Sequence, residues 1–133
     1  MKTKHNQYDT YIMKKVQLIA AILLALPLII FGGNYFVQLF PLPPGDSGIG
    51  DQLLQMMRDG GLMRYVAFAH VFLGVLLLIP KTRTVAALLH IPITMGMVCF
   101  HIAMLPAGTA MAAIMLLLNV LAAWDKDKLK ALL

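Results

Sequence analysis

The sequence predicts an all-α integral membrane protein: a four-helix antiparallel transmembrane bundle with a short outer interfacial amphipathic helix. Two observations carry this prediction. Of the 133 residues, 60% are hydrophobic and only 13% are charged, whereas soluble domains are about 45–50% apolar and about 25% charged. The charged residues also flank four long apolar segments. This composition excludes an ordinary soluble enzyme, a disordered tail and a disulfide-rich secreted scaffold.

The first predicted span covers residues 16–40 and follows a basic segment. Its 25 residues can cross a hydrocarbon core of about 30 Å with some tilt. The same length is too great for the 7–15-residue core of a signal peptide, so we expect a membrane helix that is retained in the protein. Pro27 lies inside this segment and predicts a kink.

Three further spans are predicted at residues 62–79, 84–105 and 107–124. Each of them must be helical, because lipid offers no water to satisfy free backbone groups. Pro80 follows the second span and ends it, because proline has no backbone N–H to donate and its ring clashes with the preceding helical turn. We expect residues 1–133 to form a single transmembrane domain.

A short amphipathic helix is predicted at about residues 50–60, in the long connection between the first two spans. The connection starts with Pro41–Gly45, which contains three prolines and therefore cannot continue the first helix. The apolar face of this helix consists of Leu53, Leu54, Met56 and Met57. With such a face, the helix could lie on the outer leaflet, cap the bundle or serve as a plain connector.

The positions of the basic residues predict the orientation. With the N-terminus inside, nine of the 11 Lys and Arg residues lie on the inner side and two, Arg58 and Arg64, on the outer side. Cytoplasmic loops carry this excess of positive charge, so both termini should face the cytoplasm. The net charge of +5 thus reflects membrane topology, and the predicted partner is the lipid bilayer rather than nucleic acid.

Few polar side chains lie within the predicted spans, and polar groups in lipid are costly enough to mark functional sites. No carboxylate lies within a span, which argues against a proton pump built on buried acids. At 1.5 Å per residue from the span ends, His70, His101 and Asn34 fall in the outer half and form a candidate outer pocket for a cofactor. His90 and Asn119 fall near the inner ends and form a weaker inner pair.

Several interpretations of the histidines remain open. In the simplest, they hydrogen-bond asparagines or backbone carbonyls along a packing seam, with His90, Thr94, Met97 and His101 on one stripe. In the second, His70 and His101 donate to the carbonyls of a quinone headgroup and relay protons. Haem b would use the same two histidines, but their depths differ by roughly 6 Å. Copper(I) would use His101 with neighbouring methionines. The sequence does not identify a cofactor; quinone is favoured over haem b and copper, and we assign no metal site.

Several short motifs follow one another in an order that resembles the DoxX-like family of small bacterial membrane proteins. The resemblance extends from about residue 16 to residue 133. The motifs are FGGNYF at Phe31–Phe36, FPLPP at Phe40–Pro44, GVLLL at Gly74–Leu78, the pair Phe100 and His101 ahead of LPAG at Leu105–Gly108, and Asn119 with Trp124 before the charged C-terminus.

This resemblance implies a four-helix transmembrane bundle in the bacterial inner (cytoplasmic) membrane. The family's namesake is the small membrane subunit of a thiosulfate:quinone oxidoreductase, and some relatives join membrane oxidoreductase complexes that handle thiol stress. The resemblance thus implies an accessory or quinone-interacting subunit, with other membrane or redox proteins as partners and self-association left open. His101 matches the family pattern, whereas His70 stands where relatives often carry a glutamate.

A second class of function also fits the sequence: a non-catalytic structural or assembly subunit of a larger membrane complex. The chain has no dinucleotide-binding glycine motif and no redox cysteine pair, because Cys99 is its single cysteine. It is therefore not a complete redox enzyme by itself, and whether it is an enzyme at all stays open. A small transporter is disfavoured, because four short helices leave little room for an alternating-access site.

Overall fold

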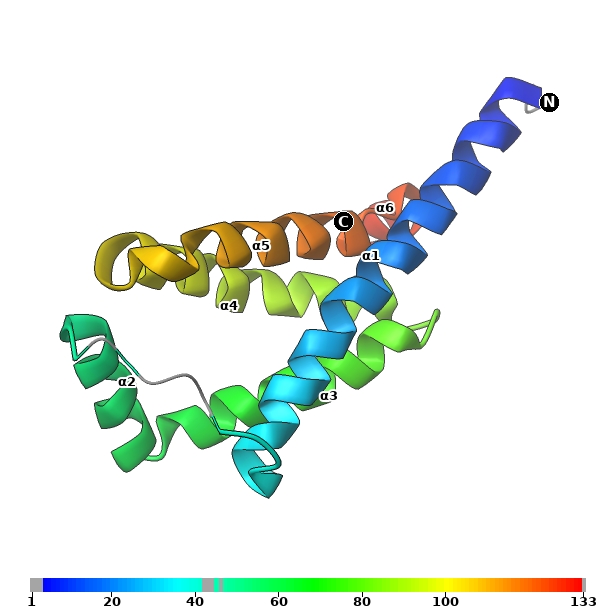
Figure 1. Ribbon diagram of the computed structural model, residues 1–133. Helices are drawn as coiled ribbons and strands as arrows, with labels where there is room; N and C mark the ends of the chain where they lie inside the picture. The colour runs from blue at the N-terminus through cyan, green and yellow to red at the C-terminus, as the bar shows by residue number, and fades with distance from the viewer. Residues whose placement is uncertain (1–3, 42–44, 46, 133) are drawn as a thin grey trace.

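The structure is a computed structural model that describes residues 4–41, 45 and 47–132 (Figure 1). These residues form helices and connecting turns and contain no strand. Part of the predicted helix-breaking segment, residues 42–44, lies outside the described residues. The elements are α1 (Lys4–Val37), α2 (Ile49–Asp59), α3 (Leu62–Leu78), α4 (Arg83–Met104), the 3₁₀ turn η1 (Pro106–Gly108), α5 (Thr109–Ala123) and α6 (Lys126–Leu132).

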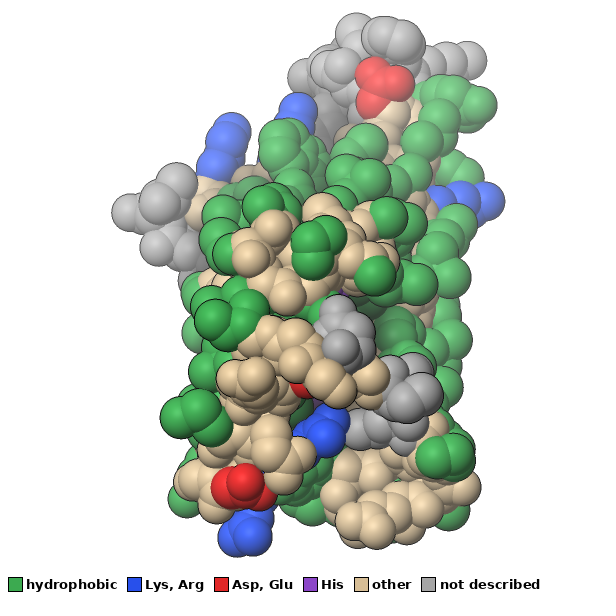
Figure 2. Space-filling view, turned by 60° about the vertical axis from the view of Figure 1, so that its left-hand side comes forward, with side chains coloured by type: hydrophobic (Ala, Val, Ile, Leu, Met, Phe, Trp, Pro, Cys, Tyr) green, Lys and Arg blue, Asp and Glu red, His purple; other side chains and the backbone are tan. Residues whose placement is uncertain are grey.

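Three segments of the described chain are long and apolar enough to cross a membrane. They are Tyr8–Val37 in α1, the whole of α4, and Pro106–Ala123, which joins η1 to α5. Helices α2 and α3 meet at a bend of 87° and make a fourth candidate if the pair counts as one broken span. Figure 2 shows hydrophobic side chains over most of the flanks of the molecule, with few charged ones between them. The prediction of an all-helical protein with several helices long and apolar enough to span a membrane is confirmed for the described residues.

The helices pack as two pairs. Helix α1 crosses α3, while α4 and α5 lie side by side (Figure 1). The pairs are joined because α1 also contacts α5 and α3 contacts α4. The core between them consists largely of alanines, of which Ala21, Ala25, Ala87 and Ala122 are wholly buried. Small side chains let helices approach closely, which is how helices pack in lipid, where burial of apolar surface gives little driving force.

Helix α1 is longer at its N-terminal end than the predicted span. It begins at Lys4 and ends at Val37, because Gln38 adopts a positive φ of 50° that no helix can continue. The side chain of Asn34 then holds the chain as it leaves the helix. Its Nδ2 donates to the carbonyl of Phe40 at 2.9 Å, and its Oδ1 accepts from the Phe40 amide at 3.1 Å.

Two glycines set the distance between α1 and α3. A Cβ atom at Gly32 would lie 2.9 Å from the carbonyl oxygen of Ala67, and one at Gly74 would lie 2.8 Å from Cγ1 of Ile29. Both positions therefore exclude a side chain at the observed separation of the helices. Gly33, by contrast, faces open space. Close approach of α1 and α3 therefore depends on glycine at these two positions.

The turn between α3 and α4 is held by cations. Arg83 is 7% exposed, and its Nε donates to the carbonyl of Leu77 at 3.0 Å and its Nη2 to that of Leu78 at 3.5 Å. Lys128 donates to the carbonyl of Pro80 at 2.6 Å. The last carbonyls of a helix have no partner within the helix and carry partial negative charge, so cations stabilise this end.

Replacing Arg83 by alanine is expected to lower the free energy of unfolding by about 1–2 kcal/mol, because it removes two charge-assisted hydrogen bonds that water at the helix end replaces in part. Lys81 is exposed, so the K81A variant is the matched control and should change stability by less than about 0.5 kcal/mol. Unfolding in detergent micelles with increasing sodium dodecyl sulfate measures both. Equal midpoints for the two variants would contradict the role of Arg83.

Candidate functional site

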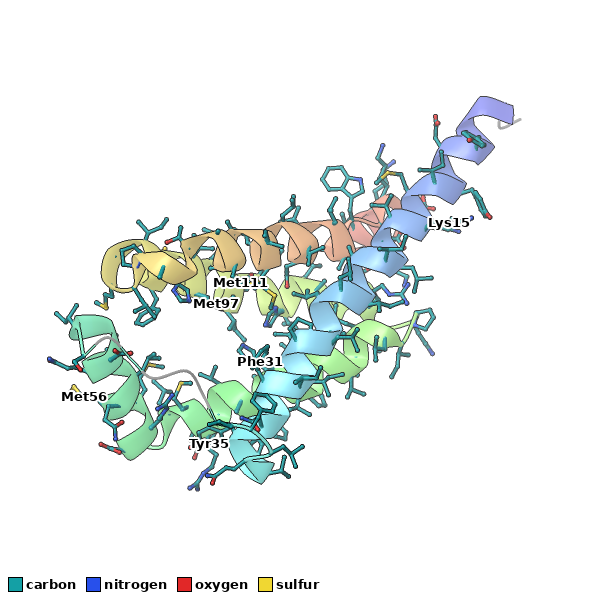
Figure 3. The ribbon with its side chains drawn as sticks, in the orientation of Figure 1. Lys15, Phe31, Tyr35, Met56, Met97 and Met111 are labelled. Carbon is teal, nitrogen blue, oxygen red and sulfur yellow. The ribbon has the colours of Figure 1, made fainter. Side chains whose placement is uncertain are left out.

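An open cavity of about 900 Å³ lies between the C-terminal end of α1, the last turn of α2 and the first half of α3. Its lining is largely apolar and aromatic, with Phe31 and Phe40 packed edge to face at 5.8 Å between ring centroids. Phe31 and Tyr35 lie on the part of α1 that crosses α3 (Figure 3). Small-molecule sites are typically cavities of about 300–1,000 Å³ with such a lining and a few polar groups. The polar side chains that line this cavity are Asn34, Tyr35, Gln38, Arg58 and His70.

Of the three residues predicted for the outer pocket, Asn34 and His70 line this cavity. The amide of Asn34 is engaged twice with the backbone of Phe40, so its main role is to hold the chain after α1. His70 differs, because it forms no hydrogen bond with any described residue and its Nε2 atom is enclosed by protein. Nδ1 is therefore the ring nitrogen that a ligand in the cavity can reach.

Arg58 brings a positive charge to the cavity from the last turn of α2. Its side chain is exposed, and among the described residues its guanidinium has no ion pair or hydrogen bond. Arginine offers five donors in a fixed planar arrangement, so an unpaired guanidinium beside a cavity is a ready partner for oxygen acceptors. Sequence reasoning assigned Arg58 to the outer surface and missed the cavity, because its place depends on the bend between α2 and α3.

The structure does not bring His101 to this cavity. The Nδ1 atom of His101 lies 3.0 Å from the carbonyl oxygen of Leu105, and its ring packs against Phe100 at 5.3 Å between centroids. A Cβ atom at Gly108 would overlap the His101 ring. His101 is thus a packing residue at the junction of α4 and η1.

His70 instead meets His90, with ring centroids 5.4 Å apart and an interplanar angle of 67°. The reason is the register of α3 and α4, which leave a common turn. His70 lies eight residues before the end of α3 and His90 seven after the start of α4, or roughly 12 Å and 10 Å from the turn. His101 lies 18 residues along α4, roughly 27 Å away from the turn.

The structure brings the two residues of the predicted inner pair into contact. Nδ1 of His90 lies 2.7 Å from Oδ1 of Asn119, and Nδ2 of Asn119 donates to the carbonyl of Ala87 at 2.8 Å. Both side chains are wholly buried. These contacts join α4 to α5 and place a polar pair directly beside His70.

Gln17 is a buried polar residue that the sequence analysis missed. Its Nε2 donates to Oγ1 of Thr84 at 3.2 Å and to the carbonyl of Ala122 at 3.0 Å, so it joins α1, α4 and α5. A signal was present, because Gln17 is a lone amide just inside the first apolar segment. It lies on the far side of the core from the cavity-lining end of α1 and belongs to the fold rather than to the site.

The described residues contain no group of three or more His, Cys, Asp and Glu side chains that could hold a metal ion. A second cavity, of about 180 Å³, lies between the N-terminal part of α1 and the start of α6. Charged side chains of both signs line it, including Asp9, Lys14 and Lys126. The larger cavity therefore offers the better site for an apolar ligand.

No protein-family model, curated protein or solved structure matches the chain. The resemblance to the DoxX-like family accordingly stays a prediction from the order of the motifs.

Proposed function

We propose that this protein is a small inner-membrane subunit that binds a quinone headgroup in the cavity between α1, α2 and α3. In this proposal it is a DoxX-like accessory component of a membrane oxidoreductase complex. Helices α1, α3, α4 and α5 cross the membrane in alternating directions, α2 lies at the outer surface, and both termini are cytoplasmic. The observation that carries the proposal is the cavity itself, with its aromatic lining and its unpaired hydrogen-bond donors.

The residues of the cavity fit a quinone headgroup. A quinone ring is flat and apolar, and its two carbonyl oxygens accept hydrogen bonds. Phe31 and Phe40 supply an aromatic surface, while His70, Tyr35 and Arg58 supply donors beside it. The bound quinone would supply the electron-transfer chemistry, and the residues of this chain would bind and orient its headgroup.

A structural or assembly subunit without a ligand is the second candidate. One observation favours it: Asn34 and Asn119, two of the predicted site residues, are already engaged in hydrogen bonds that hold the fold. In this candidate His70 and His101 have the same, purely structural role, so the H70A and H101A variants should behave alike. The two candidates therefore predict different effects for the same pair of variants.

The test is titration of the purified protein in lipid nanodiscs with a short-chain quinone, followed by isothermal calorimetry. We expect saturable binding that weakens about tenfold in the H70A variant, since the loss of one hydrogen bond is worth about 1.4 kcal/mol. The H101A variant is the control and should bind like the wild-type protein. Equal affinities for the two variants, or no saturable binding by the wild type, would favour the structural subunit.

A further inference from the structure

The contacts of Asn119 fix the protonation of the His90 ring. A backbone carbonyl oxygen can only accept a hydrogen bond, so the atom of Asn119 that faces the carbonyl of Ala87 at 2.8 Å is the Nδ2 donor. The amide oxygen of Asn119 then faces Nδ1 of His90 at 2.7 Å. Nδ1 of His90 must therefore carry the proton. In the neutral ring this leaves Nε2 as a bare lone pair.

That lone pair has no partner within the described structure, and neither has Nε2 of His70. Both atoms are enclosed by protein, and the two rings lie 5.4 Å apart between centroids. A buried polar atom without a hydrogen bond is costly, and native structures rarely retain one without a ligand, an ion or a water molecule. Two such atoms on neighbouring rings indicate a shared occupant.

We propose that His70 and His90 form a site for a single monovalent soft metal ion, Cu(I), bound between their Nε2 atoms. Imidazole nitrogen is a good ligand for copper, and a lone pair held by a hydrogen bond to the other ring nitrogen is the usual form of a ligating histidine. Asn119 supplies that hydrogen bond to His90.

The charge of the surroundings selects a monovalent ion. The described residues form no cluster of three or more His, Cys, Asp or Glu side chains, and no carboxylate lies within α3 or α4. A divalent ion held by two neutral rings would leave two uncompensated charges in a medium of low dielectric constant, which is very unfavourable. Zinc also requires four ligands in structural sites, whereas Cu(I) accepts two.

The separation of the rings nearly fits one ion. In a linear unit with metal–imidazole bonds of about 2 Å, the two ligating nitrogens lie about 4 Å apart and the ring centroids about 6 Å apart, so the rings, whose centroids are 5.4 Å apart, must move apart slightly to hold the ion. This site differs from the copper site that the sequence analysis considered on α4, because it uses neither His101 nor the neighbouring methionines. It does not depend on the proposed quinone, since that ligand would reach Nδ1 of His70 and the ion would bind Nε2.

The experiment uses the full chain in detergent with the C99S substitution, which removes the single thiol and its affinity for copper. Cu(I) is added without oxygen in competition with a chromogenic chelator, and X-ray absorption at the copper edge reports the ligands. We expect one Cu(I) per chain, with two nitrogen neighbours and no sulfur. The H70A and H90A variants should lose this binding, whereas H101A should retain it.

Three results would overturn the proposal: no binding beyond that of the H70A/H90A double variant, sulfur in the copper coordination shell, or loss of binding in H101A alone. The absorption spectrum needs no substitution at either histidine and so remains decisive if a variant fails to fold. A water molecule between the two rings would give the first of these results.

Discussion

Replacing Asn119 by leucine is expected to lower the free energy of unfolding by about 1–3 kcal/mol, the cost of a buried donor left without its acceptor. Leucine is branched like asparagine and has the same number of side-chain heavy atoms, with bulkier methyl groups in place of the amide oxygen and nitrogen, so the shape at the site is approximately kept while the polar contact is lost. Nδ1 of His90 then has no partner in a position that is wholly buried. Unfolding in mixed micelles with increasing sodium dodecyl sulfate measures the change.

The double variant H90L/N119L is the control for this prediction. With both partners replaced by apolar side chains, no buried donor is left over, and most of the lost stability should return. A single N119L variant as stable as the wild type would contradict the account of this pair. A double variant less stable than the single one would show that packing, rather than the hydrogen bond, is what the substitution disturbs.

The second large effect is expected from two neighbouring glycines of α1. Gly32→Ala places a Cβ atom 2.9 Å from the backbone oxygen of Ala67 and 3.0 Å from Cβ of His70, so α1 and α3 must separate. Such overpacking costs about 1–3 kcal/mol. Gly33→Ala meets nothing within 4 Å and should raise stability by up to about 1 kcal/mol, because alanine favours the helix.

The two alanine variants therefore form a matched pair, with the same chemical change one residue apart on one helix. The same detergent titration compares their unfolding midpoints, and we expect a difference in unfolding free energy of about 1–4 kcal/mol between them. Similar midpoints would mean that the crossing of α1 and α3 does not depend on close contact at Gly32.

Much of the helical architecture could be predicted from the sequence, because apolar segments of membrane-spanning length must be helical in lipid. The bounds of α3, α4 and α5 differ from the predicted ones by one or two residues. Two features could not be predicted. The N-terminal extension of α1 carries charged residues that give no apolar signal, and the 87° bend between α2 and α3 depends on where α2 packs.

The candidate site was predicted in part. The polar residues within the spans indicated Asn34 and His70, which share the cavity, as well as His90 and Asn119, which share a hydrogen bond. The sequence analysis grouped His101 with His70, but the structure keeps them apart. The depth of each histidine was counted from the outer end of its span, away from the turn that joins α3 and α4. Measured from the turn shared by α3 and α4, His70 and His90 stand at nearly the same level.

The proposed quinone site is tested most directly by photolabelling in native membranes. The probe is an azido-substituted quinone, and the labelled peptides are identified by mass spectrometry. The proposal predicts labels on the end of α1 around Phe31 and Tyr35 and on the adjoining parts of α2 and α3, which excess unmodified quinone should suppress and H70A should reduce. Labels spread over the lipid-facing surfaces of α4 and α5, unaffected by excess quinone, would contradict it.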